Sequence, residues 1–346
     1  MVNIHAFLGD FQGCGTLRVI YPYLLLAQHM NKFNIKFNCT YGAQYVFDKT
    51  FYERMTYMLF QRAATKQQYQ IFDHLKKNVR TPRIYEIDDL LINIPKWNMA
   101  HDYYSANEKY TKRFLRESRA IIVSTEYLGN VYSKFNENII VSLNHLPKFI
   151  WGERKPKEFS NNKKRILWGG SSNHFNLKGN GGDMDDKLLN FIRNSTDKYQ
   201  WIFKGGFPNE LNDLKGKEIE YHGWSTTHEY PNFLKSLNVD LGIAPLEDND
   251  FNKSKSNIKA IEYSALGIPG VYSNVEPYKN MSCIANNSEE FIDLINTLCD
   301  NEAEYKRVQD KDYNTLKDQM YWEENQNLYR YIDNTLKIFN LTLPTI

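Results

Sequence analysis

The chain has 346 residues, of which 42% are hydrophobic and 14% aromatic, and its net charge at pH 7 is +2. This composition excludes a disordered chain and provides enough apolar residues for two domains of ordinary size. The four cysteines form no CxxC pair, which predicts free thiols in a reducing cytoplasm. The N-terminus lacks a signal-peptide pattern, and no apolar stretch approaches the about 18 residues of a membrane helix. We therefore expect a cytoplasmic protein without a membrane partner.

The charge is unevenly distributed along the chain. Residues 1–150 carry seven more Lys and Arg than Asp and Glu, whereas residues 151–346 carry five fewer. Such an excess is compatible with an ordinary solvated surface and also with a surface that meets an anionic partner such as nucleic acid.

The first 150 residues alternate short apolar segments with helical ones. A strand at 3–8, a glycine-containing loop and a helix at 16–30 open the chain, but the glycine spacing is not GxGxxG and does not indicate a dinucleotide site. Further strands are predicted at 35–40, within 55–62, and at 83–89, 120–124 and 139–143, and helices at 67–78, 110–118 and 125–135. This alternation predicts an α/β domain over 1–150 with one parallel sheet covered on both faces.

Polar residues near these strands are candidate functional groups. Asp88 and Asp89 come at the end of the 83–89 segment, at the sheet edge where open α/β sheets bind ligands. Their carboxylates can act as a base or accept hydrogen bonds from sugar hydroxyls, and they can equally cap the following segment. Asp10 is a second candidate base. Arg18, Arg62 and Asp89 are the candidate contacts to an acceptor, and Arg18 can equally be a surface charge.

A Pro- and Asn-containing basic segment at 151–164 predicts a linker to a second α/β domain over 165–320. Its strands are predicted at 165–168, 200–203, 219–222, 239–246 and 270–273. A helical tail, 321–346, is expected to cross back to the N-terminal domain.

Four loops after these strands offer groups that suit a nucleotide diphosphate. A Gly/Ser loop allows close approach of a phosphate or sugar, and His174 at its end either donates to such a ligand or serves as a turn residue. The loop before a helical run at 258–266 combines a possible Ser254 or Ser256 cap with lysines and the positive end of the helix dipole. The candidate donor-binding residues are Gly170, Ser171, Lys204, His222, Trp224, Ser254, Lys255, Ser256, Asn257, Lys259 and Glu262.

Residues 240–278, DLGIAPLEDNDFNKSKSNIKAIEYSALGIPGVYSNVEPY, together with ILWGGSSNHF, YQWIFKGG and YHGW, resemble retaining, GT4-like glycosyltransferases of the GT-B fold. In the N-terminal half, GCGTLRVIYPYLL and EIDDLLINIP resemble the same family. The resemblance implies two Rossmann-like domains facing an interdomain cleft, with Glu262 on the ribose of a nucleotide sugar. It further implies that the diphosphate is bound by Lys204, Lys255, Ser256, Asn257 and Lys259. The family's second glutamate is replaced by Ser254, at the position that contacts the transferred sugar.

The segments FNKSKSNIKAIEY, GGSSNHF and GDFQGCGTLRVIYP are similar to glycosyltransferases of T-even-type bacteriophages. Some of these enzymes attach glucose or arabinose to hydroxymethylated cytosine. The similarity implies transfer of a hexose or pentose from a nucleotide diphosphate sugar, such as a UDP-sugar, to 5-hydroxymethylcytosine in double-stranded phage DNA within the host cytoplasm. It implies retention of configuration and no need for a metal or cofactor.

Two alternatives remain open from the sequence: transfer to a surface polysaccharide, lipid-linked glycan or protein, and a non-catalytic protein that binds DNA or a nucleotide sugar. Asp88, Asp10 and His174 are the candidate catalytic residues. With retention, the leaving phosphate can take the acceptor proton, whereas inversion requires a carboxylate such as Asp88 or Asp10 as base.

Overall fold

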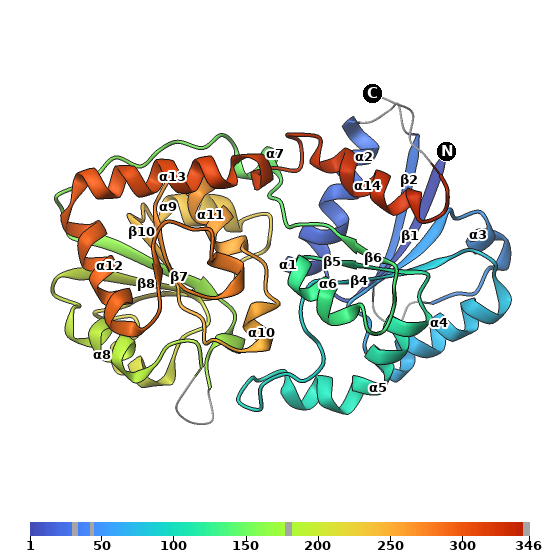
Figure 1. The fold of residues 1–346 in the computed structure, drawn as a ribbon, viewed down its shortest axis with the longest axis horizontal. Helices are drawn as coiled ribbons and strands as arrows, with labels where there is room; N and C mark the ends of the chain where they lie inside the picture. Colours follow the sequence, from blue (N-terminus) through green and yellow to red (C-terminus); the bar gives the residue numbers. More distant parts are fainter. Residues whose placement is uncertain (30–33, 42–44, 177–181, 342–346) are drawn as a thin grey trace.

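The structure, a computed structural model, describes residues 1–29, 34–41, 45–176 and 182–341. Two six-stranded parallel sheets lie side by side, each with helices on both faces (Figure 1). This confirms the predicted α/β architecture of two Rossmann-like sheets. The domain limits predicted at residues 150, 165 and 320 stay a prediction.

The N-terminal sheet has the strand order β2-β1-β3-β4-β5-β6. Its strands are β1 (Val2–Leu8), β2 (Ile35–Tyr41), β3 (Tyr57–Gln61), β4 (Arg83–Ile87), β5 (Ala120–Val123) and β6 (Ile139–Val141). The helices of this half are α1 (Gly13–Gly15), the π-helical turn η1 (Thr16–Ile20), α2 (Tyr21–His29), α3 (Lys49–Glu53), α4 (Lys66–Asn78), α5 (His101–Glu117), α6 (Glu126–Tyr132) and α7 (Lys148–Trp151).

The C-terminal sheet has the order β12-β11-β10-β7-β8-β9. Its strands are β7 (Lys164–Gly170), β8 (Tyr199–Gly205), β9 (Glu220–His222), β10 (Leu241–Ala244), β11 (Gly270–Ser273) and β12 (Ile284–Ala285). The helices are α8 (Asp186–Asn194), α9 (Tyr230–Ser236), α10 (Asp250–Lys253), α11 (Ile258–Leu266), α12 (Ser288–Asp300), α13 (Glu302–Met320) and α14 (Asn327–Lys337).

Several predicted bounds were wrong. The helix expected at 16–30 is two helical pieces, η1 and α2, preceded by α1, and its last residue lies outside the described residues. The helix expected at 110–118 begins at His101, because polar residues on its exposed face conceal the periodicity of its first turns. β12 went unpredicted since its two residues are too short to give a pattern.

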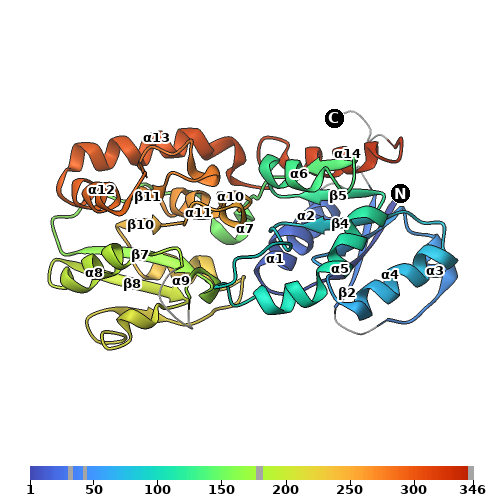
Figure 2. The ribbon, with the colours of Figure 1, turned by 60° about the horizontal axis from the view of Figure 1, so that its bottom comes forward.

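Each sheet separates two apolar cores. One core of the N-terminal sheet includes side chains from the end of the chain, among them Trp322, Tyr331 and Ile332, all at most 3% exposed. In both views α13 covers the C-terminal sheet, whereas α14 lies beside α2 on the N-terminal side (Figures 1 and 2). The last described helix is therefore part of the N-terminal core. None of the helices in the described ranges is both long and apolar enough to cross a membrane.

The contribution of α14 can be tested at Ile332, which is fully buried in the N-terminal core. Ile332→Ala should lower the free energy of unfolding by about 2–5 kcal/mol, because it removes buried methylenes and leaves a cavity. Asn334→Ala, an exposed position of the same helix, should change it by less than about 0.5 kcal/mol. Denaturant unfolding measures both variants, and equal effects would contradict this packing.

Candidate active site

A cleft of about 720 Å³ lies between the two halves of the molecule. The N-terminal half contributes the loop after β1 and the start of the helical segment behind it. The C-terminal half contributes loops after β7, β8 and β9 and the first turns of α9 and α11. Its lining residues are Asp10, Gln12, Gly13, Leu17, Gly170, Ser171, His174, Lys204, Gly205, Trp224, Ser225, Thr227, Tyr230, Lys259 and Glu262.

The loops after β7 and β8 are locked against each other by backbone contacts. The Gly206 N–H donates to the Gly170 carbonyl at 2.8 Å. Gly205 adopts a φ of +95°, and a Cβ at this position would collide with the same carbonyl oxygen. Only glycine combines this φ with such a close approach. The glycines after these strands therefore fix the edge of the cleft that holds Ser171 and Lys204.

His174 lines the cleft and is oriented by a carboxylate. Its Nδ1 lies 2.6 Å from Asp183 Oδ2, and the other Asp183 oxygen accepts from the Glu247 N–H and from Asn252 Nδ2. Burial lowers the pKa of His174, and Lys255, whose Nζ lies 3.4 Å from Nε2, lowers it further. The imidazole is thus neutral at pH 7, with Nδ1–H donating to Asp183 and the unprotonated Nε2 facing the Lys255 ammonium.

Lys259 and Glu262 form an ion pair on the cleft side of α11. Lys259 Nζ lies 2.8 Å from Glu262 Oε2, and the Tyr230 hydroxyl lies 3.4 Å from both groups. Burial alone would lower the pKa of Lys259, but the neighbouring Glu262 carboxylate raises it, so the ammonium stays charged. One Glu262 oxygen, Oε1, is left for another donor.

Lys204 and Trp224 connect the cleft to a neighbouring pocket of about 710 Å³. Lys204 is 4% exposed and donates to the Gly223 carbonyl, and burial lowers the pKa of its ammonium group. Trp224 is 74% exposed. His222 lines only the neighbouring pocket, where its Nε2 lies 2.7 Å from Glu220 Oε1.

Three candidate donor residues before α11 are instead engaged in contacts within the protein, and that of Ser256 joins the two halves. Ser254 is fully buried and its hydroxyl donates to the Asp250 carbonyl. Ser256 accepts a 2.6 Å hydrogen bond from Asn144 Nδ2, and Asn257 exchanges hydrogen bonds with Gln319. None of the three lines the cleft. The expected Ser cap of α11 is wrong as well: the N-cap is Asn257, and no side chain bonds the free N–H groups.

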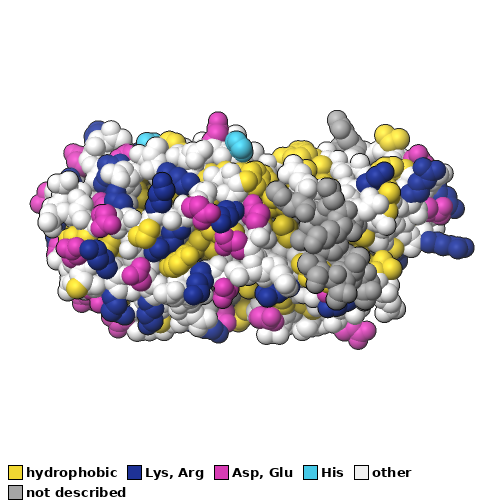
Figure 3. Space-filling model, turned by 90° about the horizontal axis from the view of Figure 1, so that it is seen from above, with side chains coloured by type: hydrophobic (Ala, Val, Ile, Leu, Met, Phe, Trp, Pro, Cys, Tyr) yellow, Lys and Arg dark blue, Asp and Glu magenta, His cyan; other side chains and the backbone are white. Residues whose placement is uncertain are grey.

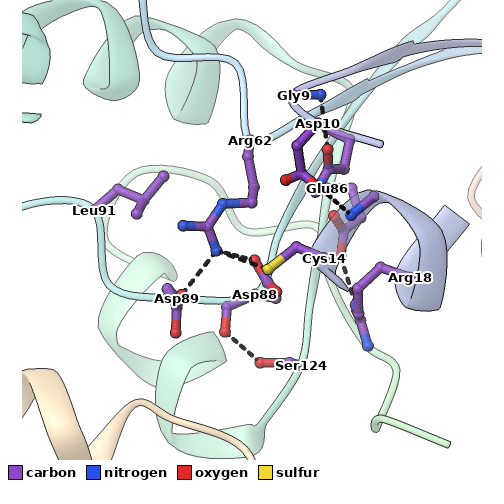
Figure 4. Close-up of polar contacts among 12 residues, drawn as sticks. Gly9, Asp10, Cys14, Arg18, Arg62, Glu86, Asp88, Asp89, Leu91 and Ser124 are labelled. Carbon is purple, nitrogen blue, oxygen red and sulfur yellow. Dashed lines mark hydrogen bonds and ion pairs between the residues drawn. The ribbon is translucent and has the colours of Figure 1, made fainter. Parts of the chain in front are cut away.

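The acceptor candidates fall into two places. Asp10 lines the cleft, and its Oδ1 accepts from the N–H groups of Gln12 and Gly15 at 2.8 and 3.1 Å. Arg62 lies outside the cleft lining and binds both Asp88 and Asp89, at 2.5 and 2.7 Å (Figure 4). Burial alone would raise the pKa of Asp88, but Arg62 and Arg18 hold it below its usual value. Asp88 is therefore a paired carboxylate, and of the two predicted bases only Asp10 faces the cleft.

The structure does not support an acceptor contact for Arg18. Its guanidinium is 2% exposed, and its Nε lies 2.7 Å from Glu86 Oε1 (Figure 4). Its Nη1 donates to the Ser142 carbonyl and to Asn144 Oδ1 at 2.6 and 3.0 Å. The sequence alone gives no sign of this role, because Glu86 and Asn144 are distant along the chain.

Other cleft residues went unpredicted. Thr227 lies shortly before α9, and Tyr230 begins that helix. Gln12 comes directly before α1, and Leu17 follows it. Asp183 was not among the predicted site residues: Asp185 caps α8, whereas Asp183 orients His174. A polar residue next to a glycine loop is the only sequence signal at these positions. No three His, Cys, Asp or Glu side chains come together as metal ligands within the described ranges.

No protein-family model matches the chain, and no curated protein sequence matches it significantly. Solved structures do match over the whole chain. Sucrose-phosphate synthase from Thermosynechococcus elongatus has a TM-score of 0.70 at 10% identity, over 98% of this chain and 100% of the other.

Two further structures match with the same coverage, 98% of this chain and 100% of theirs. An alpha-glucosyltransferase in complex with UDP and a 13-mer DNA gives a TM-score of 0.60 at 10% identity. The DNA-modifying enzyme beta-glucosyltransferase gives 0.57 at 13% identity. The fold is GT-B. This confirms the fold that the sequence motifs predicted.

The buried pair behind the cleft makes a pH-dependent prediction. Burial raises the pKa of Glu86 to about 7 against the opposing effect of Arg18. A carboxyl with a raised folded-state pKa stabilises the fold below the unfolded-state pKa, and this contribution disappears as pH rises through about 7. As pH rises from 5 to 8, the wild type should therefore lose stability relative to Glu86→Gln. The loss of unfolding free energy should be about 1.4 kcal/mol for each unit by which folding raises the pKa of Glu86.

The comparison removes the general cost of the substitution, because the replacement of the carboxyl group by an amide is present at both ends of the pH range. Denaturant titrations at pH 5, 6, 7 and 8 measure the difference. A difference that is flat across this range would contradict the raised pKa of Glu86.

Proposed function

We propose that the protein is a glycosyltransferase that moves a hexose or pentose from a nucleotide diphosphate sugar, most simply a UDP-sugar, to an acceptor hydroxyl. The observation that carries the proposal is the convergence of Lys204, Lys259 and Glu262 on one cleft of a GT-B fold. Two cations suit a diphosphate, and a carboxylate with a free oxygen suits the hydroxyls of a ribose. The structural neighbours solved with UDP support the same donor.

The chemistry follows from charge. Negative charge develops on the diphosphate as it leaves the sugar, and fixed cations stabilise it without reorganisation in a site that excludes water. Lys204 and Lys259 would do this together with the uncapped N–H groups at the start of α11. Lys255 would act through His174, which it contacts, and Gly170 and Ser171 would approach the phosphates with their backbone.

We propose retention of configuration, with the leaving phosphate taking the acceptor proton. Should the reaction invert instead, Asp10 is the base that the cleft offers, because the Asp88 carboxylate is already paired with Arg62. His174 lines the cleft and would act there together with Lys255, whose ammonium its Nε2 contacts, to orient the sugar or the acceptor. We further propose that catalysis needs no metal or cofactor and takes place in the cytoplasm.

The proposed acceptor is 5-hydroxymethylcytosine in double-stranded DNA. It is supported by the phage-like sequence motifs and by two neighbours whose descriptions name DNA. The excess of cations in residues 1–150 agrees with a polyanionic partner. The hydroxymethyl group reaches the cleft only if the base leaves the stack, at a cost of a few kcal/mol.

The function is tested by incubating the protein with a panel of nucleotide sugars and DNA that contains 5-hydroxymethylcytosine. We expect one donor to add the mass of one hexose or pentose to the modified nucleoside, detected by mass spectrometry, while DNA with unmodified cytosine stays unchanged. Addition to a glycan or protein instead would reject the DNA acceptor and keep the transferase. No transfer to any acceptor and no binding of UDP would reject both.

The donor assignment is tested by Glu262→Gln. Removing one charged hydrogen-bond acceptor from the ribose should lower kcat/KM about 10- to 100-fold. Glu276→Gln is a matched control, because Glu276 forms an ion pair of the same short spacing with Lys279 outside the cleft. Its activity should stay within twofold of wild type. Equal activities of the two variants would show that Glu262 does not contact the donor.

A further inference from the structure

A further pocket lies at the opposite edge of the N-terminal sheet from the cleft. It has a volume of about 710 Å³ and opens where β4, β5 and β6 begin, whereas the cleft lies at the strand ends. We call it the basic pocket, after the cations that line it: Arg80, Arg83, Arg116, Arg119 and Lys134.

The charge of the basic pocket is not balanced by its own carboxylates. Only Glu117 and Glu137 line it alongside the five cations, and Glu117 is already bound by Lys76 and Arg113 from outside. Within the described ranges none of the five cations forms an ion pair. By contrast, the face shown in Figure 3 mixes both signs of charge. On α13, for example, Lys306 pairs with Glu302 and Arg307 with Glu304. The basic pocket therefore holds uncompensated positive charge.

Two buried donors of the pocket lack a partner. Ser118 is 6% exposed and its hydroxyl has no hydrogen bond among the described residues, and neither has Arg83 Nε. Both atoms are closed off from solvent, so the capacity of the pocket to bind a ligand rests on its cations.

Cations at this sheet edge could serve only to satisfy the carbonyl ends of the helices. Among the five cations Arg83 does this in part, and Asn136 does the rest. Asn136 Nδ2 donates to the Leu115 and Ser118 carbonyls, and Arg83 Nη1 donates to the Thr81 carbonyl. The guanidinium groups of Arg80, Arg116 and Arg119 are not used in this way, and Arg116 lies over the Phe135 ring at 5.1 Å. They remain available to a ligand.

We propose that the basic pocket binds phosphate groups of a nucleic-acid strand. Guanidinium forks match phosphate oxygens in a bidentate manner, and a strand presents phosphates in series to several arginines. A lipid surface is less suited, because binding there also needs exposed apolar side chains, and none of the large exposed hydrophobic residues lines the pocket. The pocket would hold DNA outside the cleft, and the proposal does not require that the protein transfers sugar.

The test compares two triple variants of the full chain that remove the same charge. The pocket variant is Arg80→Gln/Arg116→Gln/Arg119→Gln, and the control is Lys36→Gln/Lys49→Gln/Arg54→Gln, three exposed cations of the same half that line no part of the pocket. Binding of a labelled unmodified duplex is measured by fluorescence anisotropy between 50 and 200 mM salt.

We expect the pocket variant to bind at least tenfold more weakly and to lower the slope of log K against log salt by roughly 2–3, since each lost phosphate contact contributes about 0.9. The control should change affinity less than twofold.

Other outcomes overturn the proposal. Equal losses in the two triple variants would mean that only net charge matters. Pocket-dependent binding of inorganic phosphate, or of vesicles with anionic lipids, without pocket-dependent binding of DNA would assign the pocket to another anion. UDP binding, measured by thermal shift, should be the same in wild type and the pocket variant. A loss of DNA binding in the pocket variant can therefore be distinguished from a defect of the donor site.

Discussion

The buried contact between Arg18 and Glu86 is the constraint on which the arrangement of the two halves depends. Both side chains are almost fully buried, and removing one partner of such a pair typically costs about 3–5 kcal/mol because the other charge is left unpaired. The guanidinium also binds Asn144, and Asn144 binds Ser256, directly before α11. One polar chain thus runs from the middle of the N-terminal sheet to the loop that begins the Lys259–Glu262 helix.

The two chain crossings between the halves are fixed at the same place. His145 Nδ1 donates to the Gln319 carbonyl at 2.6 Å, and the Gln319 side chain bonds Asn257. Leu146 and Tyr321 form a bridge between the segments that leave each half. Further out, Phe251 of α10 packs into an N-terminal core. The width of the cleft is consequently set by buried polar contacts at the crossings, and a change there would alter the cleft without touching a residue in it.

The dependence of the cleft on contacts between distant segments also explains which features could be predicted from the sequence. The apolar strands and the α11 segment were predictable, since each is a local pattern, and Gly267 ends α11 with a φ of +73° as its position suggested. Gly170, Lys204 and Glu262 could be singled out because the ends of parallel strands meet at one sheet edge. Arg18 and Ser256 could not be placed correctly, because their partners come from distant segments and a buried polar contact leaves no periodic signal. His222 was misplaced for the opposite reason: its partner, Glu220, is close by and turns it into the neighbouring pocket.

The positive charge of residues 1–150 does not lie where a polyanionic acceptor would enter. In the described structure, Asp10 is the one ionisable side chain that this half contributes to the cleft lining. Behind it, Arg62 faces the carboxylates of Asp88 and Asp89 and is balanced by them. Unpaired arginines gather instead at the opposite sheet edge. The N-terminal wall of the cleft offers little electrostatic attraction to a phosphate backbone. Attraction of DNA and positioning of its reactive base would therefore be tasks of two separate surfaces. In that arrangement the cleft can keep a carboxylate near the acceptor hydroxyl without sacrificing affinity for a polyanion.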